Sequence, residues 1–156
     1  MELTIDQALQ KAIAAHKSGE LQDAERLYRG ILQVQPQHPD ANHNLGVLAV
    51  AVGKPEAALS VFKIALETNP KQRQFWISYI DTLIKTTQLE TASKVLQQGR
   101  SNGLSGEVVD ALEKQLSYQG NERHKMTSTE NLASAISLRE VGKYSEAQEW
   151  LGEWLA

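Results

Sequence analysis

Apolar positions in this chain recur at helical spacing, and the whole arrangement repeats about every 34 residues. Three segments, residues 5–38, 39–72 and 73–106, superimpose without a gap. Repetition at this period is typical of helical arrays, in which each repeat buries its apolar face against its neighbours. The pattern therefore predicts an all-α protein in which every segment contributes a pair of antiparallel helices.

Small, aromatic and proline residues keep the same register in successive segments. The aligned positions are Gly19 with Gly53, Ala24 with Ala58 and Ala92, Tyr28 with Phe62 and Leu96, and Pro36 with Pro70. Thr4 and Gln7 have the spacing of a capping box, so the first helix is expected to begin there. Gly19 can take the left-handed conformation that ends a helix, and a proline stops the second helix of the pair. Gly46 and Ala58 are expected where two helices cross closely.

The third segment departs from this register at three positions. Ile80 replaces Gly46, Thr87 replaces Gly53, and Leu104 replaces Pro70. Residues 107–118 then place apolar side chains on one side only, which predicts a terminal helix that shields the repeats. Residues 119–127 are polar, aperiodic and contain a Gly-Asn pair, so we expect a loop.

The motif returns at residues 128–156, where Gly142 aligns with Gly53 and Ala147 with Ala58. We expect a fourth helical hairpin there, preceded by a capping box at Thr127, and about nine helices in all. Its last helix carries Trp150 and Trp154, a large apolar surface with no following helix to cover it. Three explanations stay open: the chain is the N-terminal piece of a longer protein, the surface is buried in a homodimer, or the helix folds back on the array.

Composition and charge narrow the function classes. The chain has 156 residues, 41% of them hydrophobic, a net charge of −3 and no cysteine. No segment concentrates Lys and Arg as phosphate binding requires, so nucleic acid is excluded as a partner. The sequence has no apolar run of about 18 residues and no secretory signal, so we expect no membrane span and a cytoplasmic protein.

The second segment carries the fullest set of a known signature: Leu45, Gly46, Ala58, Phe62, Ala65 and Pro70. On these residues the chain resembles a tetratricopeptide repeat protein, which implies a right-handed α-solenoid. Residues 38–46 and 53–58 are similar to the repeats that precede bacterial glycosyltransferase domains of the O-linked N-acetylglucosamine transferase type. The resemblance implies a non-catalytic scaffold that binds a peptide segment or partner protein on a concave surface formed by the first helix of each repeat.

Among the residues at the positions that line this surface in the family, eight are predicted to bind the partner: Gln10, His16, Lys17, His43, Asn44, Ser78, Asp81 and Lys85. Asn44 stands where the family often places an asparagine that hydrogen-bonds the backbone of a bound peptide. Asp81 and Lys85 have the spacing of an ion pair on one helix face. The carboxylate clamp of chaperone-binding repeats is not expected, because Leu9, Ile13, Gln74 and Ser78 occupy its positions.

The four histidines, His16, His38, His43 and His124, do not form a recognised metal motif. A zinc or iron site needs about three or four convergent ligands, so we expect solvated or capping histidines, no metal and no cofactor. No phosphate-binding glycine loop or nucleophile elbow is present, so no catalysis is expected. Two alternatives to a peptide scaffold remain: a module that self-associates through Trp150 and Trp154, and the substrate-presenting leader of a transferase.

Overall fold

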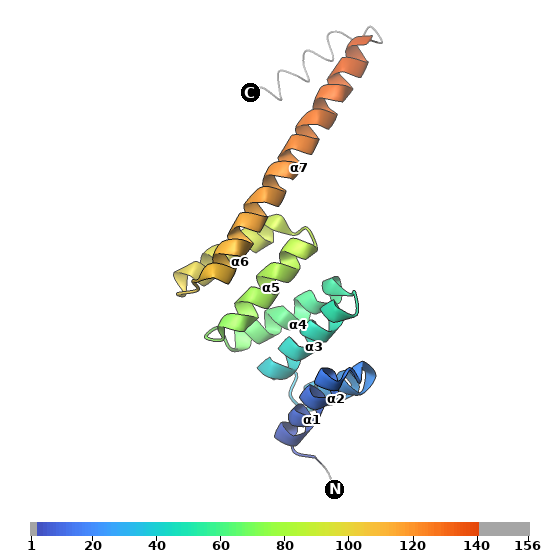
Figure 1. Ribbon diagram of the computed structural model, residues 1–156, viewed down its shortest axis with the longest axis vertical. Helices are drawn as coiled ribbons and strands as arrows, with labels where there is room; N and C mark the ends of the chain where they lie inside the picture. The colour runs from blue at the N-terminus through green and yellow to red at the C-terminus, as the bar shows by residue number, and fades with distance from the viewer. Residues whose placement is uncertain (1–2, 141–156) are drawn as a thin grey trace. The chain divides into compact units, whose positions relative to one another are not determined.

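The computed structural model describes the backbone of residues 3–140 and the side chains of residues 3–130, and every regular element in this range is an α-helix (Figure 1). The helices are α1 (Ile5–Ser18), α2 (Leu21–Val34), α3 (Pro39–Ala51), α4 (Pro55–Thr68), α5 (Arg73–Lys85), α6 (Leu89–Ser101) and α7 (Glu107–Glu140). The all-α prediction is confirmed, but the described range holds seven helices rather than about nine. Within it, no helix is both long enough and apolar enough to cross a membrane.

The chain divides into two compact units, Met1–Leu116 and Ser117–Ala156. The first unit contains α1 to α6 and the beginning of α7. Its helices pack in chain order, each against the next, as pairs joined by short turns (Figure 1). This succession is the arrangement that the repeat pattern predicts.

Helix ends in the first unit follow local sequence signals. Thr4 and Gln7 form the predicted capping box, in which the Thr4 hydroxyl accepts from the Gln7 amide and the Gln7 side chain accepts from the Thr4 amide. Gly19 ends α1 with a φ of 83°. His38 caps α3, because its Nδ1 accepts a hydrogen bond of 3.3 Å from the Ala41 amide.

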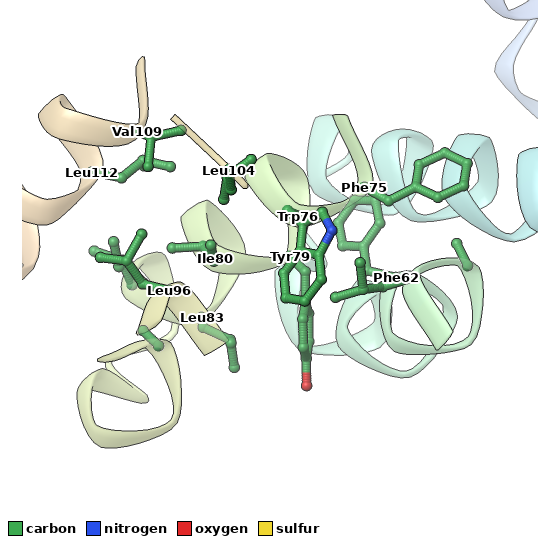
Figure 2. Packing of buried hydrophobic residues seen from close by; sticks show 14 of the residues in the cluster. Phe62, Phe75, Trp76, Tyr79, Ile80, Leu83, Leu96, Leu104, Val109 and Leu112 are labelled. Carbon is green, nitrogen blue, oxygen red and sulfur yellow. The ribbon is translucent and has the colours of Figure 1, made fainter. Parts of the chain in front are cut away.

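Two apolar clusters fill the spaces between the helices of this unit. The N-terminal cluster joins α1, α2 and α3 and consists of Leu9, Ala12, Ala15, Ala24, Tyr28, Ile31, Ala41, Leu45 and Leu48. The C-terminal cluster joins α4, α5, α6 and the start of α7, with larger side chains such as Phe62, Trp76 and Tyr79 (Figure 2). Val109 and Leu112 of α7 are buried in the C-terminal cluster, so the first turns of α7 close it as the predicted shielding helix would.

The crossing of α3 and α4 depends on Gly46. A Cβ atom placed on Gly46 would lie 2.5 Å from Cε1 of Phe62, whose side chain is itself buried. The equivalent position in the third repeat holds Ile80, which is fully buried. In the third repeat the glycine at the crossing lies on the other helix, because a Cβ on Gly99 of α6 would lie 3.1 Å from Cε3 of Trp76 in α5.

Helix α7 differs from its prediction. The loop expected at residues 119–127 is wrong, because α7 continues unbroken through them. Thr127 does not cap a new helix, since its hydroxyl donates to the carbonyls of Arg123 and His124 inside α7. A Cβ on Gly120 would meet nothing within 4 Å, and glycine in a helix costs only about 1 kcal/mol. Residues 128–140 of the predicted fourth hairpin belong to α7, and residues 141–156 lie outside the described range.

Arg100 contacts the beginning of α7, and Arg73 contacts the turn before it. The Arg100 guanidinium bonds the carboxylates of Asp110 at 2.6 Å and Glu113 at 2.7 Å. These contacts with the two acids raise the pKa of Arg100 above its ordinary value. Arg73 donates to the Ser105 carbonyl in the preceding turn at 3.1 Å. The Arg100 contacts fix the first turns of α7 against α6, and the Arg73 contact fixes the preceding turn against α5.

Candidate functional site

The predicted partner-binding residues all lie on the first helices of the three repeats, α1, α3 and α5, which contact one another in order. We call this surface the odd-helix face. Helix α1 carries Gln10, His16 and Lys17, helix α3 carries His43 and Asn44, and helix α5 carries Ser78, Asp81 and Lys85.

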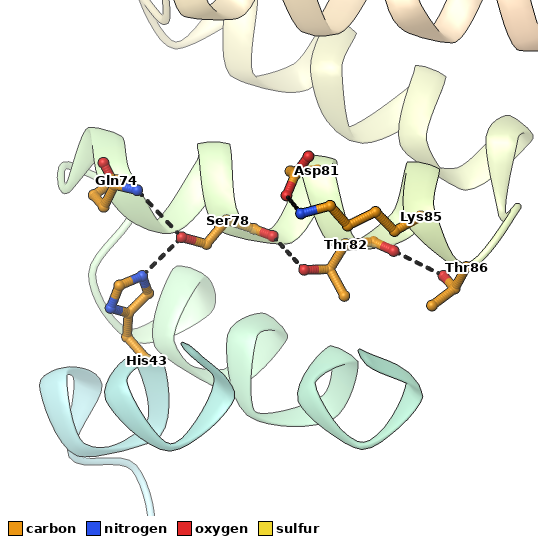
Figure 3. A network of polar contacts seen from close by, with 7 residues as sticks. All are labelled: His43, Gln74, Ser78, Asp81, Thr82, Lys85 and Thr86. Carbon is orange, nitrogen blue, oxygen red and sulfur yellow. Dashed lines mark hydrogen bonds and ion pairs between the residues drawn. The ribbon is translucent and has the colours of Figure 1, made fainter. Parts of the chain in front are cut away.

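A hydrogen bond joins two repeats across this face. His43 Nε2 lies 2.9 Å from Ser78 Oγ, and Gln74 Nε2 donates to the same hydroxyl oxygen at 3.3 Å (Figure 3). The three side chains come from α3 and from two successive turns of α5. The arrangement fixes the Ser78 hydroxyl and ties the second repeat to the third.

His43 is buried, with 9% of its surface exposed. Its ring centroid lies 4.7 Å from that of Phe75 and 5.5 Å from that of Phe62. Burial lowers the pKa of His43 below its ordinary value, although the Asn44 side chain and the Asp40 charge act in the opposite direction. The ring is therefore neutral at pH 7, with one nitrogen as donor and the other as acceptor. In this position His43 orients Ser78 rather than offering its own ring to a partner.

Asp81 and Lys85 form the predicted ion pair, with Lys85 Nζ 2.6 Å from Asp81 Oδ2 (Figure 3). Their side chains are 31% and 49% exposed, so the pair lies at the surface and contributes little stability. Because the two charges compensate each other, this end of the odd-helix face has no net charge.

The predicted site residues of α1 have no polar link to those of α3 and α5 in the described range. His16 is half-buried, and its Nδ1 lies 3.5 Å from the Tyr28 hydroxyl of α2. Gln10 and Lys17 are exposed. Across residues 3–130, no hydrogen bond or ion pair links these three residues to the other five.

The centre of the face combines polar and apolar groups. Asn44 is half-buried, and Val47, one turn further along α3, is 37% exposed. Phe75, which packs on His43, was not among the predicted site residues. The repeat period places it at the position of Ala41, which is also fully enclosed, so the alignment could have indicated a buried neighbour there.

The predicted association surface near the end of the chain is not part of the described range. Trp150 and Trp154 lie outside the described residues. For the histidines, no group of three or more His, Asp or Glu side chains in the described range could hold a metal ion.

Comparison with known proteins identifies the repeat. Residues 15–76 match the family model described as Tetratricopeptide repeat. No curated protein sequence matches the chain.

Solved structures share the fold at low sequence identity. The Sgt2 TPR domain from Aspergillus fumigatus is 19% identical with a TM-score of 0.68, over 78% of this chain and 82% of that one. The TPR2B domain of yeast Sti1, solved in complex with pHsp70, is 17% identical with a TM-score of 0.66, over 74% and 97%. An O-GlcNAc transferase mutant from Thermobaculum terrenum is 24% identical with a TM-score of 0.56, over 64% of this chain and 20% of that one. These likenesses show the helical-repeat fold.

Proposed function

The chain carries tetratricopeptide repeats, and on this premise we propose that it is a non-catalytic scaffold whose odd-helix face binds a peptide segment of a partner protein. The observation that carries the proposal is the row of polar groups over α1, α3 and α5, in which the His43–Ser78 bond joins adjacent repeats. A structure with pHsp70 exists for one protein of the same fold, which supports this class of function.

Asn44 is the residue that would form hydrogen bonds with the peptide backbone. A side-chain amide offers a donor and an acceptor together, which matches the two groups of a peptide bond. Asn44 lies beside the fixed His43 ring and one turn from the exposed Val47. An amide next to an apolar side chain suits an extended segment that presents its backbone and one apolar residue.

The charges of the face argue for a peptide of low net charge. Asp81 and Lys85 neutralise each other, while Lys17 has no ion-pair partner in the described range. The face thus lacks the cluster of cations that would select a strongly acidic tail.

The test uses a peptide selected on the wild-type chain from a random phage-displayed library. Asn44→Ala is expected to weaken binding of this peptide about tenfold, the effect of losing well-placed hydrogen bonds. Gln22→Ala, which removes an exposed amide from α2, is the matched control and should leave the affinity unchanged. Equal affinities for all three proteins would show that the peptide does not use the odd-helix face.

A second candidate function has one observation in its favour. The fold likeness to the Thermobaculum terrenum O-GlcNAc transferase structure supports a role as the substrate-presenting leader of a transferase. The coding sequence beyond Ala156 tests the transferase hypothesis, because a transferase leader requires a catalytic domain in the same protein. Trp154→Ala tests self-association independently, since a drop in sedimentation mass would assign the Trp-bearing segment to a homodimer.

A further inference from the structure

A small cavity of about 300 Å³ lies where the turn between α4 and α5 meets the turn between α6 and α7. We call it the turn pocket, and its lining consists of Pro70, Lys71, Arg73, Trp76, Asn102, Gly103 and Leu104. It shares no residue with the odd-helix face. Its volume is at the lower end of ligand pockets, about 300–1,000 Å³, so it has room for one or two side chains of a larger ligand.

The charge of the turn pocket is positive and uncompensated. Lys71 and Arg73 are the charged members of its lining, and no carboxylate belongs to it. Neither side chain has an ion pair with any residue from 3 to 130. Two neighbouring cations without an acid attract an anionic group, most strongly when hydrogen bonds can form as well.

Arg73 is held in place by the opposite turn. Its Nη2 donates to the Ser105 carbonyl at 3.1 Å. Gly106, with a φ of 110°, passes so close that a Cβ there would lie 3.1 Å from the same nitrogen. The guanidinium is therefore positioned before any ligand arrives, which lowers the entropy cost of binding.

The apolar part of the lining is rigid. Trp76 is 5% exposed, and its indole Nε1 donates to the Pro70 carbonyl at 2.8 Å. Leu104 is 6% exposed and packs against Gly99. An apolar group that enters beside the cations would meet these side chains.

The preceding repeat provides an uncharged version of the same turn. There Asn42 donates to the Pro36 carbonyl at 3.0 Å, just as Trp76 donates to the Pro70 carbonyl. The residues aligned with Lys71 and Arg73 are Gln37 and Pro39. Because the turn forms with either set, its fold does not require the two cations.

From these observations we infer that the turn pocket binds an acidic peptide segment of a partner protein, with a carboxylate on Lys71 and Arg73 and an adjacent apolar side chain on Trp76 and Leu104. This second site is independent of the odd-helix face.

The experiment titrates the ¹⁵N-labelled full chain with a capped pentapeptide, Ser-Glu-Leu-Glu-Ser, and follows the indole N–H resonance of Trp76. A Trp76→Phe spectrum assigns this resonance among the three tryptophans. Two further peptides separate the contributions: Ser-Gln-Leu-Gln-Ser removes the charge, and Ser-Glu-Ser-Glu-Ser removes the apolar group. Inorganic phosphate at the same ionic strength serves as the simple anion.

We expect the acidic peptide with leucine to shift the indole resonance at the lowest concentration, and both altered peptides to bind more weakly. Lys71→Gln should weaken binding about fivefold while leaving the Arg73–Ser105 contact intact, and Lys71→Gln with Arg73→Gln about tenfold or more. The charge-matched control, Lys11→Gln with Lys54→Gln, should retain the wild-type affinity. Asn44→Ala should retain it too, which separates this site from the odd-helix face.

Two results would overturn the inference. If phosphate shifts the indole as strongly as the acidic peptide, the pocket is a simple anion site. If the charge-neutral peptide binds equally well, or the Lys71 and Arg73 variants bind like the control, the cations do not recognise a carboxylate.

Discussion

Thr87 adopts a backbone conformation that the earlier repeats assign to glycine. Its φ is 59°, and the aligned Gly19 and Gly53 have φ values of 83° and 77°. A β-branched residue is strained in this left-handed region because its Cβ crowds the backbone. We therefore expect Thr87→Gly to raise the free energy of unfolding by about 1 kcal/mol, measured by urea denaturation.

The reverse change in the second repeat is the control. Gly53→Thr imposes on a relaxed turn the strain that Thr87 already carries, so it should destabilise the chain by about 1 kcal/mol. Equal stabilities for wild type and Thr87→Gly would mean that the Thr87 turn is unstrained.

His43 should make stability depend on pH. Its folded-state pKa is lowered by burial, so the unfolded chain takes up a proton more readily than the native one. The contribution of neutral His43 to stability is fully present above the pKa of histidine in the unfolded chain, about 6.5. It is lost as the pH falls from that value toward the lower pKa of His43 in the folded chain.

Urea denaturation at pH 7.5 and pH 5.0 measures this effect. The wild type should lose stability on acidification, and His43→Gln should lose less. His124→Gln alters an exposed histidine of α7 and should behave like the wild type. Identical losses in all three proteins would exclude His43 as the titrating group.

At the scale of elements, the α3–α4 pair depends on the absence of a side chain at Gly46. Gly46→Ala would push its methyl group into the buried Phe62 ring, so we expect a loss of about 1–3 kcal/mol in the free energy of unfolding. Gly30→Ala is the matched control, because Gly30 is exposed in α2 with nothing within 4 Å. There the added methyl should stabilise the helix by about 0.5–1 kcal/mol. The two substitutions should therefore change the free energy of unfolding in opposite directions. If Gly46→Ala left that free energy unchanged, the close packing of α3 and α4 would be contradicted.

Local signals explain why the helices α1 to α6 could be predicted from the sequence. Gly19, Pro36, Gly53 and Pro70 interrupt the pattern at sites where the backbone must turn. The continuation of α7 through residues 119–127 was missed for the converse reason. A glycine inside a helix carries a modest cost, and the surrounding Glu, Arg, Lys and Met residues favour helix strongly enough to offset it.

The helices that carry the candidate residues and the Asp81–Lys85 ion pair could be predicted, but the His43–Ser78 contact between repeats could not. The repeat register alone places the eight residues on α1, α3 and α5. It does not indicate that His43 turns toward Phe75 and Ser78, because the pairing of side chains between helices depends on packing geometry. The turn pocket was missed because Lys71 lies in the turn before α5 and Arg73 begins that helix, and both are brought near Leu104 only by the packing of two turns.

For the whole molecule, the described core ends with the first turns of α7. Both apolar clusters consist of residues before 117, and Val109 and Leu112 are their last buried members. A fragment of residues 1–116 should therefore unfold cooperatively with a stability close to that of the full chain. A fragment of residues 1–106 should be less stable by about 3–6 kcal/mol, because two buried aliphatic side chains are lost.

Urea denaturation of the two fragments, followed by far-ultraviolet circular dichroism, checks this expectation. Val109→Ala in the 1–116 fragment should give an intermediate stability, because it removes part of the same contact. Equal stabilities for the fragments would show that α7 does not close the C-terminal cluster.

The unequal size of the side chains in the two clusters has a mechanical consequence. The N-terminal cluster relies on Ala12, Ala15, Ala24 and Ala41, whereas the C-terminal cluster is built around Phe62, Phe75 and Trp76. In a linear array each repeat is held only by its neighbours, so resistance to force is set locally. If the first unit were pulled from both ends in an optical trap, α1 and α2 would detach before α4, α5 and α6, whose aromatic side chains would require a higher tension.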